Sequence, residues 1–463
     1  MRRLLVAILS GLLCATPVLG DSQLTLNTVL EQVEANYPKL RGGRLMLDVA
    51  SAKVLEKQGA FDPSVALSTG YQRYNSSSDP GKAKEFFSNS ATVFRSDPSG
   101  IKWEAGWINN QGGVKSPNSS TGDFGELFVG AGIPLLRGLN INEKSVALEQ
   151  AELMETQVQY GYQQLRLSVL LDAGSAYYNW VTAVMQREIV EENVRLAQER
   201  AAQVAVSIEA GDKPRIDQVE ADREVEKRQE ALLKAERLVQ KAAIKLALYL
   251  WNSQGQAQEI PEPDQAPKAL PETDEVDRER LAYLQVKALE MRPELRKLQL
   301  QKDVVELDRE LAKNQRLPQL DLKLRPGVDL GNQGVGFTFK AGLELVIPLA
   351  TRTADGRERA ASIKLEKLSL EQVESVRRIL LQVRDAASEL EAARLRLQRA
   401  LEVYRLAKEL EEGERIKFSL GDSSLFLVNS RERSTVAAAL KVLEIRNEMA
   451  QALLLLETVT GLL

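Results

Sequence analysis

The feature that most constrains this chain is the absence of proline from two very long stretches. None of its 16 prolines lies between Pro134 and Pro214, and none follows Pro348. Because a proline inside a helix removes a hydrogen bond and clashes with the preceding turn, these stretches can form uninterrupted helices. Residues 139–210 alone would extend about 108 Å as one helix, at ~1.5 Å per residue. Compact bundles rarely use helices this long, so the pattern favours an extended molecule.

Apolar residues in the second stretch follow the spacing of a coiled coil. They recur at alternating intervals of three and four residues, interrupted once by Arg394, which is the seam that two packed helices share. The core of an ordinary helical bundle would produce a similar stripe, so that alternative stays open. The seam consists of Val376, Leu380, Val383, Ala387, Leu390, Leu397, Leu401 and Tyr404.

The chain also repeats itself. The sequence Gly-Ile-Pro-Leu at 132–135 returns as Val-Ile-Pro-Leu at 346–349, and Asp-Ala-Gly-Ser at 172–175 returns as Asp-Ala-Ala-Ser at 385–388. Gly211-Asp212 likewise returns as Gly421-Asp422. Three matches in the same order indicate an internal duplication. The proline-rich stretch 260–275 cannot be helical, and we interpret it as a linker between a first repeat, 21–259, and a second repeat, 276–463.

Each repeat shows the same order of expected elements. A helix (24–60 or 276–315) precedes a glycine-rich segment (61–133 or 317–347), and then come a long helix, a turn near residue 211 or 421 and a final helix. In the glycine-rich segments apolar residues alternate with other residues, which predicts strands. We expect Arg325-Pro326-Gly327 to form a turn between two of them.

The strand segments allow two interpretations. Aromatic residues are concentrated in the first segment, which suits the girdle of an outer-membrane β-barrel. A soluble β-subdomain that caps a helical bundle would show the same alternation, so periodicity alone does not decide between them. The aromatic residues are Tyr71, Tyr74, Phe86, Phe87, Trp103, Trp107, Phe124 and Phe128.

Residues 1–20 have the layout of a secretory signal peptide. Arg2 and Arg3 precede an apolar stretch, 4–13, and Gly20 provides a small residue before Asp21. The apolar stretch is short for a transmembrane helix, which needs about 20 residues. We therefore expect cleavage and export from a bacterial cytoplasm.

Composition excludes most familiar enzyme classes. The chain has no His, and its single Cys, Cys14, lies in the expected signal peptide. Ser-His-Asp and Cys-His catalysis and the usual zinc and haem sites are therefore excluded. A net charge of −4 with interspersed acids and bases gives no basic face for nucleic acid. We expect no catalytic residues, no metal site and no cofactor.

The whole expected mature chain resembles the TolC-like outer-membrane efflux family. Met291-Arg292-Pro293-Glu294-Leu295 is similar to a signature near the start of each half of that family, and 36–40 (Asn-Tyr-Pro-Lys-Leu) is its counterpart. Four prolines stand where the family changes between helix and strand, and Gly211 and Gly421 resemble the glycines of its periplasmic tip turns. These four junction residues are Pro63, Pro134, Pro318 and Pro348.

The resemblance implies a mainly α-helical fold with a β-barrel part. Duplicated coiled-coil hairpins of three chains would form a trimeric α-barrel in the periplasm, and their strands a shared transmembrane β-barrel. Two strands per repeat would give four per chain and twelve per trimer. The first insert is longer than the second, and it could carry extra strands or a large extracellular loop.

By the same resemblance, the protein is an outer-membrane channel for passive export, part of a tripartite efflux or type I secretion system. Its partners would be a periplasmic adaptor protein, an inner-membrane pump and outer-membrane lipid. The tips would hold the gate, for which Asp217 matches an acidic family position. The second tip departs from the family with Ser423 where a basic residue often stands, so a closing set of Lys213, Arg215 and Asp422 is the alternative. The candidates are Gly211, Asp212, Lys213, Arg215, Asp217, Gly421 and Asp422.

Two other functions compete with the channel. A periplasmic coiled-coil adaptor or scaffold would share the export signal and the long helices, but it should show a lipoyl-like β-domain and usually one hairpin. A secreted carboxylate-based hydrolase is the other alternative. Its candidate carboxylates, Glu411 and Glu412, lie on a charged helix that is typical of a solvated face.

Overall fold

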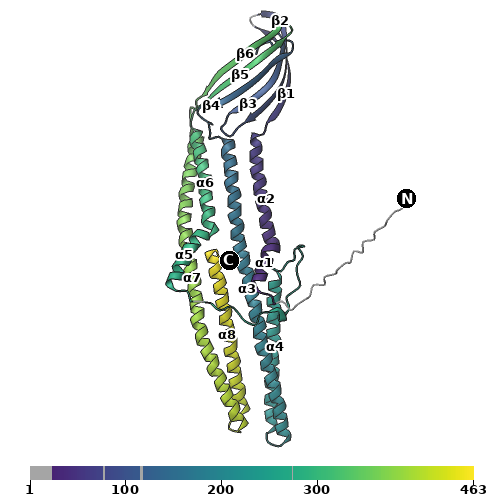
Figure 1. Ribbon diagram of the computed structural model, residues 1–463, viewed down its shortest axis with the longest axis vertical. Coiled ribbons are helices and arrows are strands. Elements are labelled where there is room, and N and C mark those ends of the chain that lie inside the picture. The colour runs from purple at the N-terminus through teal and green to yellow at the C-terminus, as the bar shows by residue number, and fades with distance from the viewer. Residues whose placement is uncertain (1–22, 77–78, 115–117, 274) are drawn as a thin grey trace, which may run out of the picture.

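The computed structural model describes residues 23–76, 79–114, 118–273 and 275–463. The expected signal peptide, 1–20, lies outside the described residues. The molecule is elongated, with a β-sheet at one end and the turns of two long helical hairpins at the other (Figure 1). No helix in these ranges is both long enough and apolar enough to span a bilayer.

Proline breaks the first helix of each repeat in two. Helices α1 (Leu26–Asn36) and α2 (Pro38–Gln58) meet at Tyr37, and α5 (Arg278–Met291) and α6 (Pro293–Asn314) meet at Arg292. Both junction residues are extended, with ψ of 124° and 120°, because a following proline disfavours the helical conformation. The expectation of one continuous helix over 24–60 and over 276–315 was therefore wrong.

One antiparallel sheet contains six strands in sequence order. The first repeat contributes β1 (Ser64–Ser76), β2 (Asp79–Ser96), β3 (Lys102–Gly112) and β4 (Gly125–Pro134), and the second contributes β5 (Gln319–Gly331) and β6 (Gly334–Val346). The expected four strands per chain are thus too few. The first insert is long enough for two hairpins, and β4 pairs with β5 to join the repeats. The 3₁₀ turn η1 (Gly59–Phe61) leads into β1.

The segment Arg325-Pro326-Gly327 is strand and not the turn that we expected. It lies in the middle of β5, and Pro326 is paired with Phe339 of β6. On the other side, the ladder to β4 is interrupted at Pro326, between the pairs Phe128–Gly327 and Ala131–Leu324. A proline lacks the N–H that a ladder needs, so it is tolerated where the ladder is interrupted. The hairpin turn lies instead between Gly331 and Gly334.

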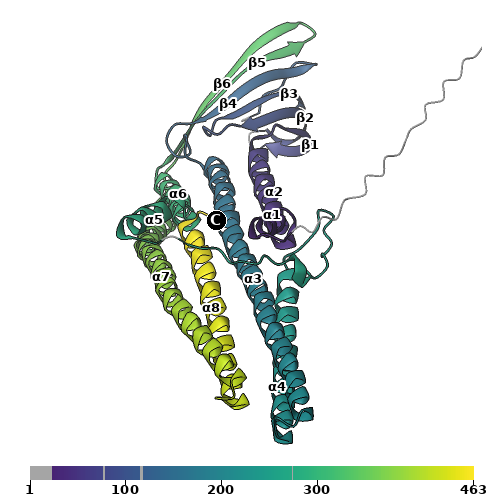
Figure 2. The same ribbon diagram turned by 60° about the horizontal axis from the view of Figure 1, so that its bottom comes forward.

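Four helices form the long hairpins. Helix α3 (Glu143–Glu209) and α4 (Arg215–Ala247) make the first, and α7 (Arg352–Ser419) and α8 (Leu425–Thr460) make the second. Helix α3 has 67 residues and α7 has 68, so both proline-free stretches are helical almost throughout. The two hairpins run side by side towards the end opposite the sheet (Figure 2).

The core lies where the repeats meet, at the level of α1 and α5. Trp180, Val181 and Leu170 of α3 are fully buried there against α1, α4 and α8, and Ile379, Val383 and Leu390 of α7 form a second cluster with α5 and α8. The segment 260–275, which includes η2 (Pro263–Gln265), contributes buried Ala266 and Leu270. This core holds the two hairpins to one another.

Helices α3 and α8 approach closely at Gly174. A Cβ atom there would lie 2.5 Å from the Cδ2 atom of Leu454, whereas a Cβ atom at Gly161 of the same helix would meet nothing within 4 Å. Alanine is intrinsically favoured over glycine in a helix by about 0.5–1 kcal/mol. At position 174 this gain is opposed by overpacking, which typically costs ~1–3 kcal/mol.

We predict that Gly161→Ala raises the stability of the helical hairpins and that Gly174→Ala lowers it. Urea unfolding of the detergent-extracted protein, followed by circular dichroism, measures both. Equal stabilisation by the two variants would contradict the close helix contact at Gly174.

Candidate functional site

The two hairpin turns are built in the same way. Gly211 and Gly421 have φ of 84° and 85°, a left-handed conformation that glycine adopts without strain. A Cβ atom at either position would meet nothing within 4 Å. The backbone conformation of the turn therefore favours glycine here, and close packing does not.

Within one chain the two turns touch. The Nζ atom of Lys213 lies 3.9 Å from the centroid of the Phe418 ring, a cation–π contact between the first turn and the end of α7. Phe418 also packs against an apolar cluster of Val204, Ala221 and Leu425. The ends of both hairpins therefore form one unit.

The other candidate gate residues form no closing set within the chain. Asp212, Arg215, Asp217 and Asp422 make no ion pair with any residue of the described ranges. Asp217 lies in the first turn of α4, and its backbone N–H donates to the carbonyl oxygen of Pro214 at 3.0 Å. Their gating role stays a prediction.

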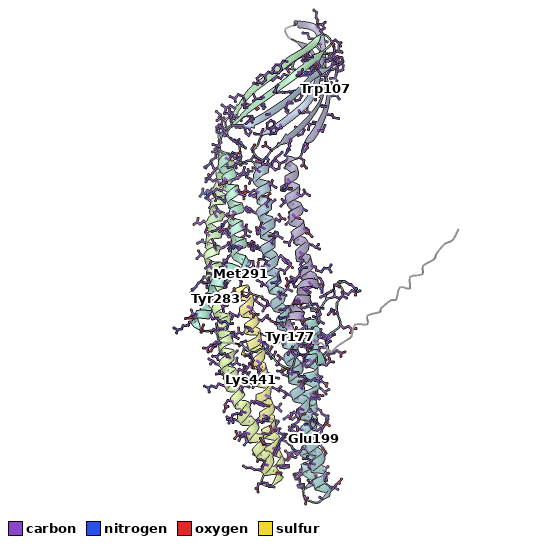
Figure 3. The ribbon with its side chains drawn as sticks, in the orientation of Figure 1. Trp107, Tyr177, Glu199, Tyr283, Met291 and Lys441 are labelled. Carbon is purple, nitrogen blue, oxygen red and sulfur yellow. The ribbon has the colours of Figure 1, made fainter. Side chains whose placement is uncertain are left out.

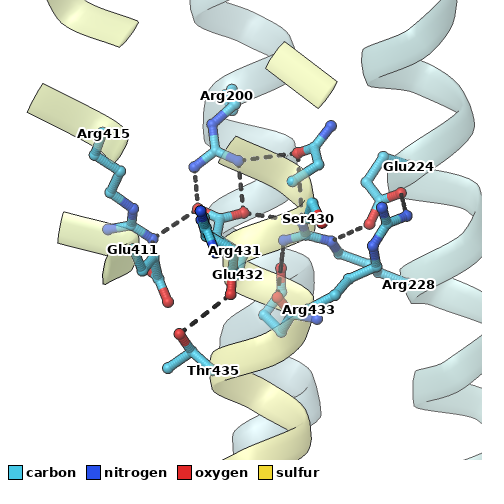
Figure 4. A network of polar contacts seen from close by, with 12 residues as sticks. Arg200, Glu224, Arg228, Glu411, Arg415, Ser430, Arg431, Glu432, Arg433 and Thr435 are labelled. Atoms are coloured by element: carbon cyan, nitrogen blue, oxygen red, sulfur yellow. Dashed lines mark hydrogen bonds and ion pairs between the residues drawn. The ribbon is translucent and has the colours of Figure 1, made fainter. Parts of the chain in front are cut away.

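A buried ionic cluster lies above the turns, and the sequence analysis did not find it. The carboxylate of Glu432 in α8, with 2% of its side chain exposed, accepts hydrogen bonds from three arginines on the three other helices (Figure 4). The Nη1 atom of Arg200 lies 2.6 Å from it, and the Nη2 atoms of Arg228 and Arg415 lie at 2.9 and 2.7 Å. We call these four residues the Glu432 cluster.

Further partners complete the cluster. Glu224 of α4 accepts from Arg228 Nε at 3.1 Å and from Arg433 Nη1 at 3.3 Å. The Asn193 side chain accepts from Arg228 Nη1 at 2.8 Å. A buried charge is tolerated when its hydrogen bonds are made in this way, so the cluster fixes α3, α4, α7 and α8 relative to one another.

The arginines keep Glu432 ionised. Burial alone would raise its pKa, but the hydrogen bonds and charges of Arg200 and Arg228 outweigh burial and lower the pKa from 4.5 to about 2. A carboxyl group whose pKa is lowered by folding stabilises the folded state above its unfolded pKa. That contribution is present above pH 4.5 and is lost as the pH falls towards 2.

One sequence signal could have indicated this cluster. Leu425, Val428 and Glu432 follow one another at spacings of three and four residues, so Glu432 continues the buried stripe of α8. In α4, Ala221, Glu224 and Arg228 do the same. A charge in line with buried residues predicts a buried partner, although sequence cannot say on which helix.

The four junction prolines lie at the sheet end of the helices. Pro63 directly precedes β1, Pro134 is the last residue of β4, and Pro318 lies between α6 and β5. Pro348 follows the end of β6 and precedes α7. Backbone contacts join the repeats here: the Leu135 N–H donates to the Leu320 carbonyl at 2.7 Å.

We predict that Glu432→Gln lowers the free energy of unfolding of the hairpins by about 3 kcal/mol at neutral pH. Arg200 is then left without a carboxylate partner, whereas Arg228 keeps Glu224 and Arg415 keeps Glu411. The difference in the free energy of unfolding between wild type and variant should shrink as the pH falls from 4.5 towards 2. Urea unfolding at several pH values measures it.

The matched control is Glu409→Gln. Glu409 forms an exposed pair with Arg405 on α7 at 3.2 Å, and such pairs contribute little to stability. This variant should unfold like the wild type at every pH. A constant difference between Glu432→Gln and wild type across the same pH range would argue against an ionised Glu432.

Comparison with known proteins supports the family resemblance. The family described as "Outer membrane efflux protein" matches residues 29–250. No curated protein matches by sequence.

Several solved structures share the fold. The chain is similar to the outer membrane protein VceC of Vibrio cholerae, with 13% identity, a TM-score of 0.65 and coverage of 94% of this chain and 96% of that one. It is also similar to the MtrE outer membrane channel of Neisseria gonorrhoeae, with 15% identity, a TM-score of 0.66 and coverage of 94% of this chain and 89% of that one. The CmeC outer membrane channel of Campylobacter jejuni is similar as well, with 15% identity, a TM-score of 0.64 and coverage of 94% of this chain and 85% of that one. The family match over residues 29–250 and the fold shared over most of the chain bear out the resemblance to the TolC-like outer-membrane efflux family.

Proposed function

We propose that the protein is the outer-membrane channel of a tripartite efflux or type I secretion system, through which cargo passes passively to the outside. The observation that carries this proposal is a sheet with one apolar face, one polar face and two unpaired edges. The family match and the fold support the same function and an outer-membrane location with a periplasmic extension.

The strand register separates the two faces. Val65, Val93, Ala105 and Val129 lie opposite one another across β1 to β4, and Leu127, Val328 and Phe337 do so across β4 to β6. These residues share a face that is strongly exposed in a single chain: Leu67 and Phe337 are 79% and 78% exposed. Trp107 lies among the strands in Figure 3. An apolar face this large requires a lipid or protein environment.

The size of this face suits a membrane. The eleven residues from Val335 to Leu345 span about 33 Å along the strand, or roughly 25 Å across a bilayer at the ~40° tilt of membrane barrels. That is the height of their apolar band. The strands are inclined to the long axis of the molecule (Figure 1).

The outer edges of β1 and β6 require neighbours. Each is paired on one side only, and hydrocarbon cannot satisfy the free backbone groups. A second copy of the chain can place its β1 beside β6. We infer that three copies close an 18-stranded barrel, from six strands in each chain.

The helices offer matching lateral surfaces. Helix α2 exposes Leu45, Met46 and Val49 at one side of the layer near the sheet, and α7 exposes Ile363, Leu370 and Val373 at the other side (Figure 1). We infer that these stripes pack against each other between copies and continue the barrel as a helical tunnel. The tunnel would meet a periplasmic adaptor and an inner-membrane pump.

The scaffold alternative is not favoured. It predicts a lipoyl-like β-domain and usually one hairpin, whereas this chain has two hairpins and a six-stranded antiparallel sheet with an apolar face. For the channel, the tip residues Gly211, Asp212, Lys213, Arg215, Asp217, Gly421 and Asp422 are the proposed gate. Asp212, Arg215, Asp217 and Asp422 lack ion-pair partners among the described residues of one chain, which leaves them available to neighbouring copies.

We predict that the detergent-extracted mature protein is a stable trimer. Light scattering corrected for bound detergent should give about three times the mass of one chain, because each copy has two sheet edges to cover. A monomer that stays in solution without detergent would overturn the shared barrel.

We also predict that Asp217→Ala raises the residual conductance of the closed channel in planar bilayers, because it removes one charge from the proposed gate. Glu199→Ala provides a control, since Glu199 lies on α3 away from the turn and pairs with Arg195 of its own helix (Figure 3). Unchanged closed-state conductance in Asp217→Ala would remove this residue from the gate.

A further inference from the structure

The polar face of the sheet contains a hollow with a floor of glycine. Gly130 and Gly132 are neighbours on the polar face of β4, and the register places side chains of β3 and β5 on both sides of each. Lys102 and Lys323 flank Gly132, and the register places Gly130 between Glu104 and Arg325. The Glu104 side chain lies over Gly130, where a Cβ atom would be 2.7 Å from its Oε1 atom. The flanking strands are about 9.6 Å apart. The hollow has a volume of about 560 Å³.

Three cations of this hollow have no ion-pair partner among the described residues. Lys323 is paired with Glu344 at 2.5 Å, and Lys340, which also lines the hollow, is paired with Glu126 at 3.2 Å. Lys102, Arg325 and Arg95 of the lining form no ion pair with any described residue. Glu104 is the one carboxylate of the lining, and it forms no ion pair within the described ranges. The charges of the lining without an ion pair are therefore three positive and one negative.

Arg325 is held rigidly and lacks hydrogen-bond acceptors. Its guanidinium group stacks on the ring of Phe128 with the Cζ atom 3.2 Å from the ring centroid, and Phe128 is buried. The Nε and Nη2 atoms are shielded from solvent and donate to no protein acceptor. Buried donors are normally satisfied, and a guanidinium fork matches an oxyanion in geometry as well as in charge.

We propose that this hollow binds an oxyanion, the phosphate or carboxylate group of an anionic solute, between Arg325 and Lys102 above Gly132 of β4. Lys323 adds positive charge at the rim, and Glu104 limits the affinity so that the anion can leave. If the sheet closes into the proposed conduit, each trimer holds three such sites on its inner wall, and they favour anionic cargo. The binding itself does not depend on transport.

Isothermal titration of the detergent-extracted full chain with inorganic phosphate, in chloride buffer of constant ionic strength, tests the site. We expect wild type to bind phosphate, Arg325→Gln to weaken binding at least tenfold and Lys102→Gln to weaken it several-fold. Gly132→Val keeps every charge but fills the floor, where the nearest atoms to a Cβ are 3.8 Å away, and should also abolish binding.

Arg73→Gln is the control for charge. Arg73 lies on the opposite, apolar-face side of the sheet, two residues beyond Tyr71, and is near Glu85 at 3.9 Å. It should bind phosphate like wild type. No binding by wild type, or equal binding by wild type and Arg325→Gln, overturns the site. Phosphate block of conductance in bilayers is the separate measurement: a protein that binds phosphate but does not conduct would contradict the proposed channel and leave the oxyanion site standing.

Discussion

One chain alone can neither pair the outer edges of its sheet nor cover the apolar face of that sheet, and the rest of the structure follows from this constraint. Its two outer edges leave backbone groups unpaired and one of its faces is apolar and exposed. In water the apolar face would cause aggregation, and in hydrocarbon the unpaired backbone donors and acceptors of the edges would be strongly destabilising. The closure by further copies within a membrane that we propose would resolve both problems. The apolar stripes of α2 and α7 then serve the same closure at the level of the helices.

The helices keep a fixed arrangement beyond the sheet because particular residues hold them together. Trp180 and its neighbours bind α1, α4 and α8 to α3, and Gly174 lets α8 approach α3 closely. Nearer the turns the apolar residues become sparse, and the Glu432 cluster takes over the role of joining the four helices. A charged hydrogen bond is directional, whereas an apolar contact is not, so the Glu432 cluster can fix the register of the hairpins in the part that lies beyond the main core.

Sequence could predict the periodic part of this structure but not its long-range pairs. Proline positions and the repeat gave the long helices, the two hairpins and the strand segments. Proline gave a wrong prediction at Pro326, where we expected a turn and the structure has a strand. A sequence cannot distinguish a turn proline from a proline that is tolerated at an interruption of the ladder. The kinks at Pro38 and Pro293 were missed because proline at a first helical position is compatible with either a start or a kink. The partners of Glu432 were not predictable, since Arg200, Arg228 and Arg415 are brought together only by the packing of four helices.

The chain treats its charges in two ways, and the difference separates structure from function. Glu432 is paired with three arginines, so its charge is compensated within the fold. Arg325 and Lys102 are oriented as firmly as structural residues, by ring stacking and strand register, yet the fold gives them no counter-charge. Unmatched charge costs stability, and a conduit gains nothing from it unless solutes use it. Uncharged serines and threonines, such as those on the same face of β2, would be enough to make this face hydrophilic. We therefore attribute the cations of the hollow to the proposed binding of anionic solutes.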